Sequence, residues 1–178
     1  MWDLLTDNSD RIWIKWCKVY LIKGRNLWSL DIPYSCSWSW RKLLQLRHPT
    51  WFIIKHQICN GSSTNFWFDN WLPGGPLSLR FPSQLLFNAG YDTATTVSCF
   101  ISNNYWSFPL SLSSVTSELL PLPAPSSNEN DKLLWSIAPS GKFSLKHTSA
   151  YFSPSSPQVP WYNLVWWSPA IPRMKFNL

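Results

Sequence analysis

Charged side chains are scarce in this 178-residue chain, since Asp, Glu, Lys and Arg together make up only 13% of it. That is about half the share that is usual in soluble domains. Because 45% of the residues are hydrophobic, the composition predicts exposed apolar patches and poor solubility if the chain stands alone. Glycine is also scarce, and the six glycines match neither the Gly-x-Gly-x-x-Gly pattern nor the P-loop. The sequence therefore offers no recognisable loop for a nucleotide phosphate.

Cysteine is sparse and unsuitably spaced for metal or redox chemistry. The four cysteines form no Cys-x-x-Cys pair, which argues against a zinc ribbon and a thioredoxin-like motif. His56-x-x-Cys59 alone offers two ligands, whereas a structural zinc site needs four. We therefore predict no metal ligands and no cofactor, and we expect reduced cysteines.

Long hydrophobic runs are missing too. No apolar stretch approaches the roughly 20 residues that cross a bilayer, and residues 1–7 lack the basic start and apolar core of a secretory signal. We therefore expect no membrane partner and, if the chain is expressed, an intracellular location in the nucleus or cytoplasm.

No arrangement of catalytic residues is recognisable. Asp69 stands between two Trp residues, but its nearest acidic neighbours in the sequence are Asp31 and Asp92. No carboxylate pair for two-metal chemistry is therefore evident. An Asp at the end of a strand that accepts hydrogen bonds from nearby backbone N–H groups is the favoured interpretation. Ser-His-Asp and Cys-His arrangements are also absent, so we predict no catalytic residues and no enzyme.

Positive charge is concentrated in residues 11–60. This segment holds nine Lys or Arg residues and one acid, a net charge of nine minus one, +8, in a chain of net charge +6. Such a segment is typical of a protein with a nucleic-acid partner, although a solvated basic surface is the alternative. Contacts to RNA or DNA phosphates would be blind to sequence and strongly salt-dependent. The predicted nucleic-acid-binding residues are Arg11, Lys15, Lys18, Arg41, Lys42 and Arg47.

Tryptophan is unusually abundant, with 14 residues. Aromatic side chains interleaved with Lys and Arg can stack on unpaired bases, and Trp platforms can also bind sugars. Most of these Trp residues lie at periodic apolar positions, which favours a place in the core.

The first helix is predicted over residues 10–23. Ser9 or Asp10 can cap its N-terminus, and Gly24 stands where a left-handed residue commonly ends a helix. Its apolar residues spread around much of the helix, so we expect burial on most sides and one narrow basic stripe.

The second helix is predicted over residues 37–47. Ser35 or Ser37 can cap it. Pro49 is expected to end it, because the residue before a proline is disfavoured in helical backbone.

Two β-hairpins are also predicted. In the first, strands 51–58 and 64–69 flank Asn60-Gly61, a strong hairpin signal because both central residues of the tight turn need positive φ. In the second, strands 133–137 and 143–145 flank a turn at Pro139-Ser140-Gly141. A lone hairpin is marginal in water, so both should pack on helices. Further short helices are predicted at residues 92–101, 144–152 and 161–167.

These elements predict an α+β fold, with short helices packed on two small antiparallel β-hairpins. The predicted organisation has two lobes, residues 1–106 and 131–178, joined by a Ser/Pro-rich linker at residues 107–130.

Three sequence blocks resemble one family. They are Ser37-Trp-Ser-Trp-Arg-Lys-Leu-Leu-Gln-Leu-Arg47; Cys59-Asn-Gly-Ser-Ser-Thr-Asn-Phe-Trp-Phe-Asp-Asn-Trp71 with Gly75-Pro-Leu77; and Trp135 through Lys146 with Trp161-Tyr-Asn-Leu-Val-Trp166 and Ile171-Pro-Arg-Met-Lys-Phe176. The first two are similar to the linker that follows the reverse transcriptase in plant non-LTR, LINE-type retrotransposon polyproteins. The third is similar to the N-terminal part of the reverse transcriptase zinc-binding domain. The order and approximate spacing of the blocks match too, so the resemblance covers residues 10–178.

The resemblance implies a fragment of a retrotransposon polyprotein. Such a fragment would lack the polymerase's paired aspartates, and the family's Cys and His zinc ligands would lie downstream of Leu178. One departure is Cys59, where the family usually has Gly. The resemblance implies, at most, a non-specific RNA- or DNA-binding remnant.

Two alternatives remain open. The chain is either an inert product of a degenerate element or a Trp-rich carbohydrate-binding module. The second alternative calls for a secretory signal and a disulfide framework, and the sequence shows neither.

Overall fold

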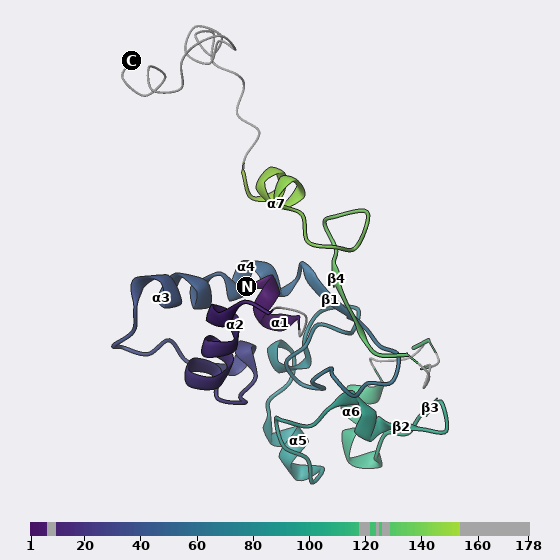
Figure 1. The fold of residues 1–178 in the computed structure, drawn as a ribbon. Coiled ribbons are helices and arrows are strands. Elements are labelled where there is room, and N and C mark those ends of the chain that lie inside the picture. Colours follow the sequence, from purple (N-terminus) through teal and green to yellow (C-terminus); the bar gives the residue numbers. More distant parts are fainter. Residues whose placement is uncertain (7–9, 118–121, 124, 126–128, 154–178) are drawn as a thin grey trace, which may run out of the picture. The chain divides into compact units, whose positions relative to one another are not determined.

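The computed structural model describes residues 1–6, 10–117, 122–123, 125 and 129–153 (Figure 1). The chain divides into two compact units, Met1–Phe143 and Ser144–Leu178. Helix α7 (Leu145–Phe152) belongs to the second unit and confirms the helix predicted at residues 144–152. The helix predicted at residues 161–167 lies outside the described residues. Among the helices of the described ranges, none has the length and apolar character needed to span a membrane.

The first unit begins with two short helices, α1 (Trp2–Leu5) and α2 (Ile12–Trp16). Helix α2 continues as a π-helical turn over Cys17–Ile22, which confirms the helix predicted for this region. It ends where Lys23 and Gly24 adopt positive φ values of 54° and 71°. Left-handed backbone of this kind ends many helices.

The predicted burial of this helix is wrong. Its inward side carries Ile14, Cys17 and Ile22, which are buried. The exposed apolar side chains of the same helix are Ile12, Trp13, Trp16, Val19 and Tyr20. Helical periodicity places apolar side chains on particular faces, but whether another element covers each face depends on the rest of the fold.

Helix α3 (Trp38–Gln45) begins at Ser37, whose hydroxyl accepts a hydrogen bond from the Trp40 N–H at 3.3 Å. Ser37 is therefore the cap, as one of the two predicted alternatives required. The next helix, α4 (Arg47–Trp51), contains Pro49, so the prediction that Pro49 ends a helix is wrong. Pro49 is tolerated because it lies in the first turn of α4, where backbone N–H groups have no partner within the helix.

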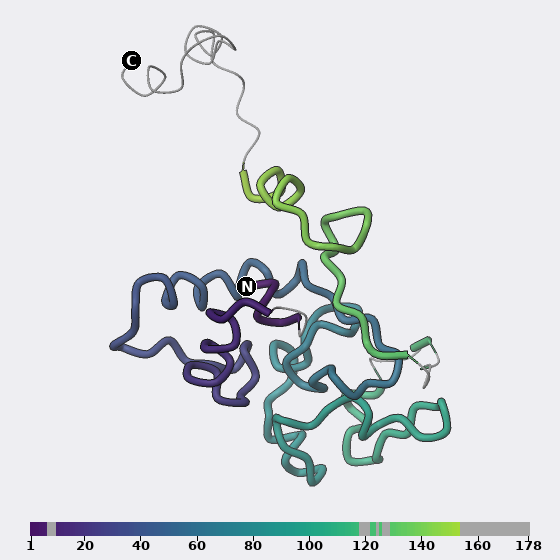
Figure 2. The backbone as a smooth tube through the Cα atoms, viewed as in Figure 1, coloured from purple at the N-terminus to yellow at the C-terminus, as the bar shows by residue number. Residues whose placement is uncertain are grey.

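The larger sheet joins segments that are distant in the sequence. Strand β1 (Ile54–Gln57) pairs antiparallel with β4 (Lys132–Trp135), and Ile54 stands opposite Trp135. In Figures 1 and 2 the green β4 segment runs beside the blue β1. The smaller sheet is a hairpin of β2 (Ile101–Ser102) and β3 (Tyr105–Trp106). The predicted α+β class, with two small antiparallel sheets, is confirmed.

The strand partners differ from the prediction, because β1 pairs with β4 rather than with residues 64–69, and β4 does not pair with residues 143–145. The chain curls after Thr64. Asn65 Oδ1 accepts hydrogen bonds from the N–H groups of Trp67 and Phe68 at 3.0 and 2.8 Å. Asp69 Oδ2 accepts one from the Asn65 N–H at 2.7 Å. Local side chain–backbone bonds of this kind compete with a strand ladder.

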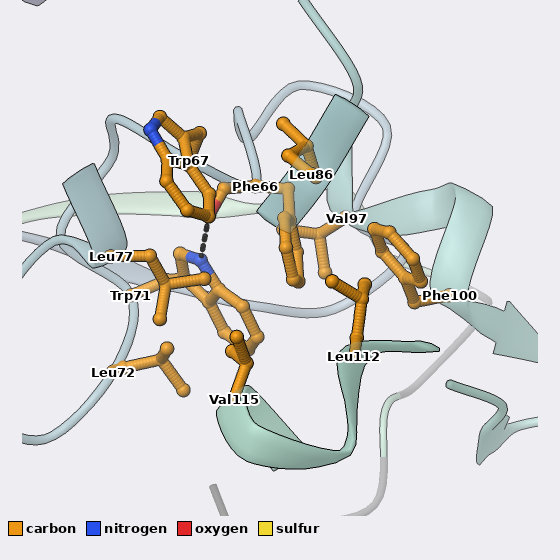
Figure 3. Packing of buried hydrophobic residues seen from close by; sticks show 10 residues of the cluster. All are labelled: Phe66, Trp67, Trp71, Leu72, Leu77, Leu86, Val97, Phe100, Leu112 and Val115. Atoms are coloured by element: carbon orange, nitrogen blue, oxygen red, sulfur yellow. Dashed lines mark hydrogen bonds between the residues drawn. The ribbon is translucent and has the colours of Figure 1, made fainter. Parts of the chain in front are cut away.

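The largest hydrophobic core surrounds Phe66, whose side chain is 0% exposed. The Phe66 ring centroid lies 4.2 Å from that of Phe100, and the Trp71 indole N–H donates to the Phe66 carbonyl at 3.0 Å (Figure 3). Leu112 and Val115 are also fully buried there. They come from a 3-10 turn, Leu110–Leu112, and helix α6 (Ser113–Thr116). Part of the predicted 107–130 linker thus packs in the first unit, whose boundary falls after Phe143.

Two smaller clusters complete the buried part of the first unit. One lies among α1, α2 and α3, and its buried residues are Leu4, Ile14, Cys17, Ile22, Leu27, Leu30, Trp40 and Leu44. The other lies at the larger sheet, and its buried residues are Trp28, Ile53, Ile54, Trp135 and Ala138. The remaining elements are helix α5 (Gln84–Asn88) and 3-10 turns at Leu27–Ser29, Leu77–Leu79 and Val97–Phe100. The last of these turns is what forms of the helix predicted at residues 92–101.

Candidate nucleic-acid interface

Two of the six predicted binding residues form exposed ion pairs. Arg11 Nη1 lies 2.8 Å from Asp3 Oδ2, and Lys15 Nζ lies 3.0 Å from Asp10 Oδ1. Exposed pairs of this kind contribute little to stability, typically about 0.2–1 kcal/mol. Both cations can therefore exchange these partners for a phosphate at small cost.

Arg47 is held by the fold itself. Its Nε donates to the Leu44 carbonyl at 2.9 Å, and its Nη1 donates to the carbonyls of Leu27 and Trp28 at 2.8 and 3.1 Å. Burial lowers the pKa of the Arg47 guanidinium, and the nearby Asp31 opposes that shift. Three carbonyl partners give this side chain a structural role between α3 and the 3-10 turn at Leu27–Ser29.

The other three predicted residues lie in different surroundings. Lys18 is half-buried, with Nζ 3.5 Å from the Thr6 carbonyl. Arg41 donates from Nη2 to the Tyr34 carbonyl at 2.7 Å. Lys42 is exposed on α3. The structure therefore places these six cations at separate points, and none of them lines the groove that is described next.

An exposed aromatic stripe follows α2 and its π-helical turn. Trp13, Trp16 and Tyr20 are three and four residues apart, which puts them on one face of a helix. They are 51%, 48% and 59% exposed, and the ring centroids of Trp16 and Tyr20 are 5.6 Å apart. The three side chains line a groove of about 400 Å³, which is also lined by residues between Pro33 and Trp40.

Lys23 and Arg25 supply positive charge to this groove. The Arg25 guanidinium donates from Nε to the Ile22 carbonyl at 3.3 Å and from Nη2 to the Leu21 carbonyl at 3.4 Å. These bonds hold it at the C-terminal end of the π-helical turn. The sequence prediction missed both cations because it selected residues by helical stripe, and both follow the last helical residue. Their position directly after the helix end, around Gly24, is the signal that identifies them.

The distribution of Trp residues separates the core from the surface. Of the 11 Trp residues in the described ranges, five are buried, three are half-buried and three are exposed. The exposed ones are Trp13, Trp16 and Trp38, all from α2 and α3. The core interpretation thus fits most of these Trp residues, and the base-stacking interpretation is left with a single region of the chain.

A buried polar pair lies apart from this groove. His56 Nε2, on β1, is 3.6 Å from Asp69 Oδ2, and both side chains are nearly inaccessible. Asp69 also accepts the hydrogen bond from the Asn65 N–H, so it has the backbone-bonding role that the sequence favoured. Within the described ranges, no three His, Cys, Asp or Glu side chains form a group that could hold a metal ion.

Burial of His56 predicts a loss of stability in mild acid. Burial lowers the pKa of His56 below its ordinary value of 6.5, while Asp69, Asp131 and the Asn70 carbonyl oppose the shift. The unfolded chain therefore binds a proton before the folded chain does. The free energy of unfolding should fall as the pH drops below about 6.5, by up to about 1.4 kcal/mol per pH unit until the folded pKa is reached.

Denaturant unfolding at about pH 7.5 and pH 5.5 measures this effect. His56→Gln should flatten the pH dependence, whereas His48→Gln, at an exposed position, should leave it unchanged. Burial raises the pKa of Asp69, and its contribution has the opposite sign, since it is lost as the pH rises. The difference between the wild-type protein and His56→Gln isolates the histidine. An identical pH dependence in the two proteins would contradict the assignment.

Comparison of the chain with protein-family models, curated proteins and solved structures found no match. Its function is therefore inferred from the geometry of the groove and from the resemblance of its sequence blocks.

Proposed function

We propose that the chain binds single-stranded RNA or DNA without catalysing a reaction, and that the groove beside α2 holds the strand. The observation that carries this proposal is the meeting of Trp13, Trp16 and Tyr20 with Lys23 and Arg25 around one groove. Aromatic rings stack on bases of any sequence, and cations contact the phosphates. Because the base faces of a duplex are already covered by neighbouring bases, this combination favours an unpaired strand.

The charge around the groove supports the same partner. Arg11, Lys15 and Lys42 are exposed on or beside α2 and α3, and they add positive potential that attracts a polyanion. The resemblance to the linker of LINE-type polyproteins supports it as well. The proposal includes descent from such a polyprotein, as a fragment that lacks the polymerase carboxylates and keeps a sequence-blind binding surface.

Removing two stacking rings should weaken binding. Trp13→Ala combined with Trp16→Ala is expected to raise the dissociation constant for an oligo-dT strand of about 20 nucleotides by roughly 10- to 100-fold, because base–aromatic stacking contributes about 1–3 kcal/mol per base. Fluorescence anisotropy of the labelled strand measures the dissociation constant. The matched control is Trp38→Ala, which removes a Trp that is 72% exposed but does not line the groove.

The salt dependence of the same titration tests the cations. Lys23→Gln combined with Arg25→Gln should reduce the slope of log K against log salt by about 1–2. Wild-type protein that shows no salt-sensitive binding of single strands would contradict the proposal and favour the inert-product alternative. Equal loss of affinity in Trp38→Ala and in the Trp13/Trp16 variant would show that this groove is not the site.

A further inference from the structure

The loop Cys59–Thr64 surrounds a carboxylate that comes from a distant part of the sequence. Asp131, just before β4, accepts five hydrogen bonds from this loop. Its Oδ1 accepts from the N–H groups of Cys59 and Gly61, both at 2.8 Å. Its Oδ2 accepts from the Ser63 N–H at 3.2 Å, the Ser63 hydroxyl at 3.3 Å and the Thr64 hydroxyl at 2.9 Å. Three main-chain and two side-chain donors thus converge on one anion.

Contacts that do not involve Asp131 also fix the shape of this loop. The Ser98 N–H donates to the Gly61 carbonyl at 2.9 Å, and the Val97 N–H donates to the Thr64 carbonyl at 2.9 Å. Within the loop, Asn60 Oδ1 accepts from the Ser62 N–H at 3.0 Å. The donors are therefore held in place from behind, and several backbone N–H groups that point into one concavity form an anion site.

The surroundings leave room for a larger anion than a carboxylate. A polar hollow of about 600 Å³ lies beside the loop and is lined by Ser62, Ser63, Asn130, Asp131 and Lys132, among others. Burial alone would raise the pKa of Asp131, but the hydrogen bonds from the loop outweigh it and lower the pKa below the ordinary 3.8. The loop thus favours the negatively charged form of its ligand.

We infer that the Cys59–Thr64 loop is an oxyanion-binding cradle. Its ligand in this chain is the Asp131 carboxylate, and the cradle accepts inorganic phosphate or sulfate when that carboxylate is removed. The cradle is separate from the groove beside α2, so it stands whether or not the chain binds nucleic acid. Its effect in the intact chain is to fasten the start of β4 to the loop that follows β1.

Thermal unfolding in increasing inorganic phosphate, at constant ionic strength set with chloride, tests the cradle. Asp131→Gly is expected to show a saturable rise in Tm of roughly 3–6 °C, because a ligand that binds only the folded state stabilises it. The wild-type protein should show no saturable rise, since its cradle is filled. Asp92→Gly removes an exposed Asp that bonds its own turn and should respond as the wild type does.

Two further variants keep the test decisive. Asp131→Asn retains the size of the side chain and replaces one acceptor oxygen, so it should fold if Asp131→Gly does not, and phosphate should raise its Tm more than that of the wild type. Adding Thr64→Val to either variant removes one donor and should weaken the phosphate effect several-fold. An equal phosphate response in the wild type and both Asp131 variants, or no response in any of them, would overturn the cradle.

Discussion

Replacement of Phe66 by Ala is expected to lower the free energy of unfolding of the first unit by about 3–5 kcal/mol. The Phe66 side chain is 0% exposed. Its ring centroid lies within 6.4 Å of those of Trp71, Phe100 and Phe108. Truncation removes the central ring of this aromatic group and leaves a cavity that its rigid neighbours cannot fill. Urea unfolding followed by Trp fluorescence measures the loss.

Phe87→Ala provides the matched control for that experiment. Phe87 lies on α5 and is 49% exposed, so the same chemical deletion should cost less than about 1 kcal/mol there. Similar losses in the two variants would mean that the ring of Phe66 is not enclosed in the protein as it exists in solution.

Replacement of Gly61 by Ala is expected to cost about 3 kcal/mol. A Cβ at this position would lie 2.7 Å from the Ser98 backbone nitrogen and 2.9 Å from the Val97 carbonyl carbon. These are backbone atoms, so they cannot rotate aside as the end of a flexible side chain can. The positive φ of 69° adds a further penalty of about 1–2 kcal/mol for a residue with a Cβ, and crowding in a packed region typically costs about 1–3 kcal/mol.

Gly24→Ala separates the two causes. Gly24 has a similar φ of 71°, but a Cβ there would meet nothing within 4 Å. This variant should therefore lose only the backbone penalty, about 1 kcal/mol. The difference in unfolding free energy between the two variants measures the close approach of the loop to Val97 and Ser98. Equal losses would show that the approach is not present in solution.

Features with a local cause could be predicted from the sequence. Ser37 caps α3, as its hydroxyl allows, and the helix that follows Asp10 ends at the left-handed pair Lys23 and Gly24. The Asn60-Gly61 signal was correct about the positive φ of Gly61. It failed to identify the partner of β1, because the side chains of Asn65 and Asp69 bind nearby backbone N–H groups and curl the chain away from a strand.

The candidate groove could be predicted only in part. Charge density located the correct region, residues 11–60, but not the side chains that line the groove. Lys23 and Arg25 line it because the chain turns at Gly24. Arg47 resembles a surface cation in the sequence, yet three carbonyls surround it. Whether Trp13 and Trp16 are covered depends on the elements beside them, and periodicity carries no information about those elements.

The pairing of β1 with β4 has a consequence for the chain while it is being synthesised. Asp131 follows Cys59 by 72 residues, so at about 5–20 residues per second the ribosome needs roughly 4–14 seconds to deliver it. Until then the edge of β1 is open to other nascent chains, which is a recognised route to aggregation. Recombinant production that stops before Asp131 would make this vulnerable interval permanent, and expression through Phe143 would end it.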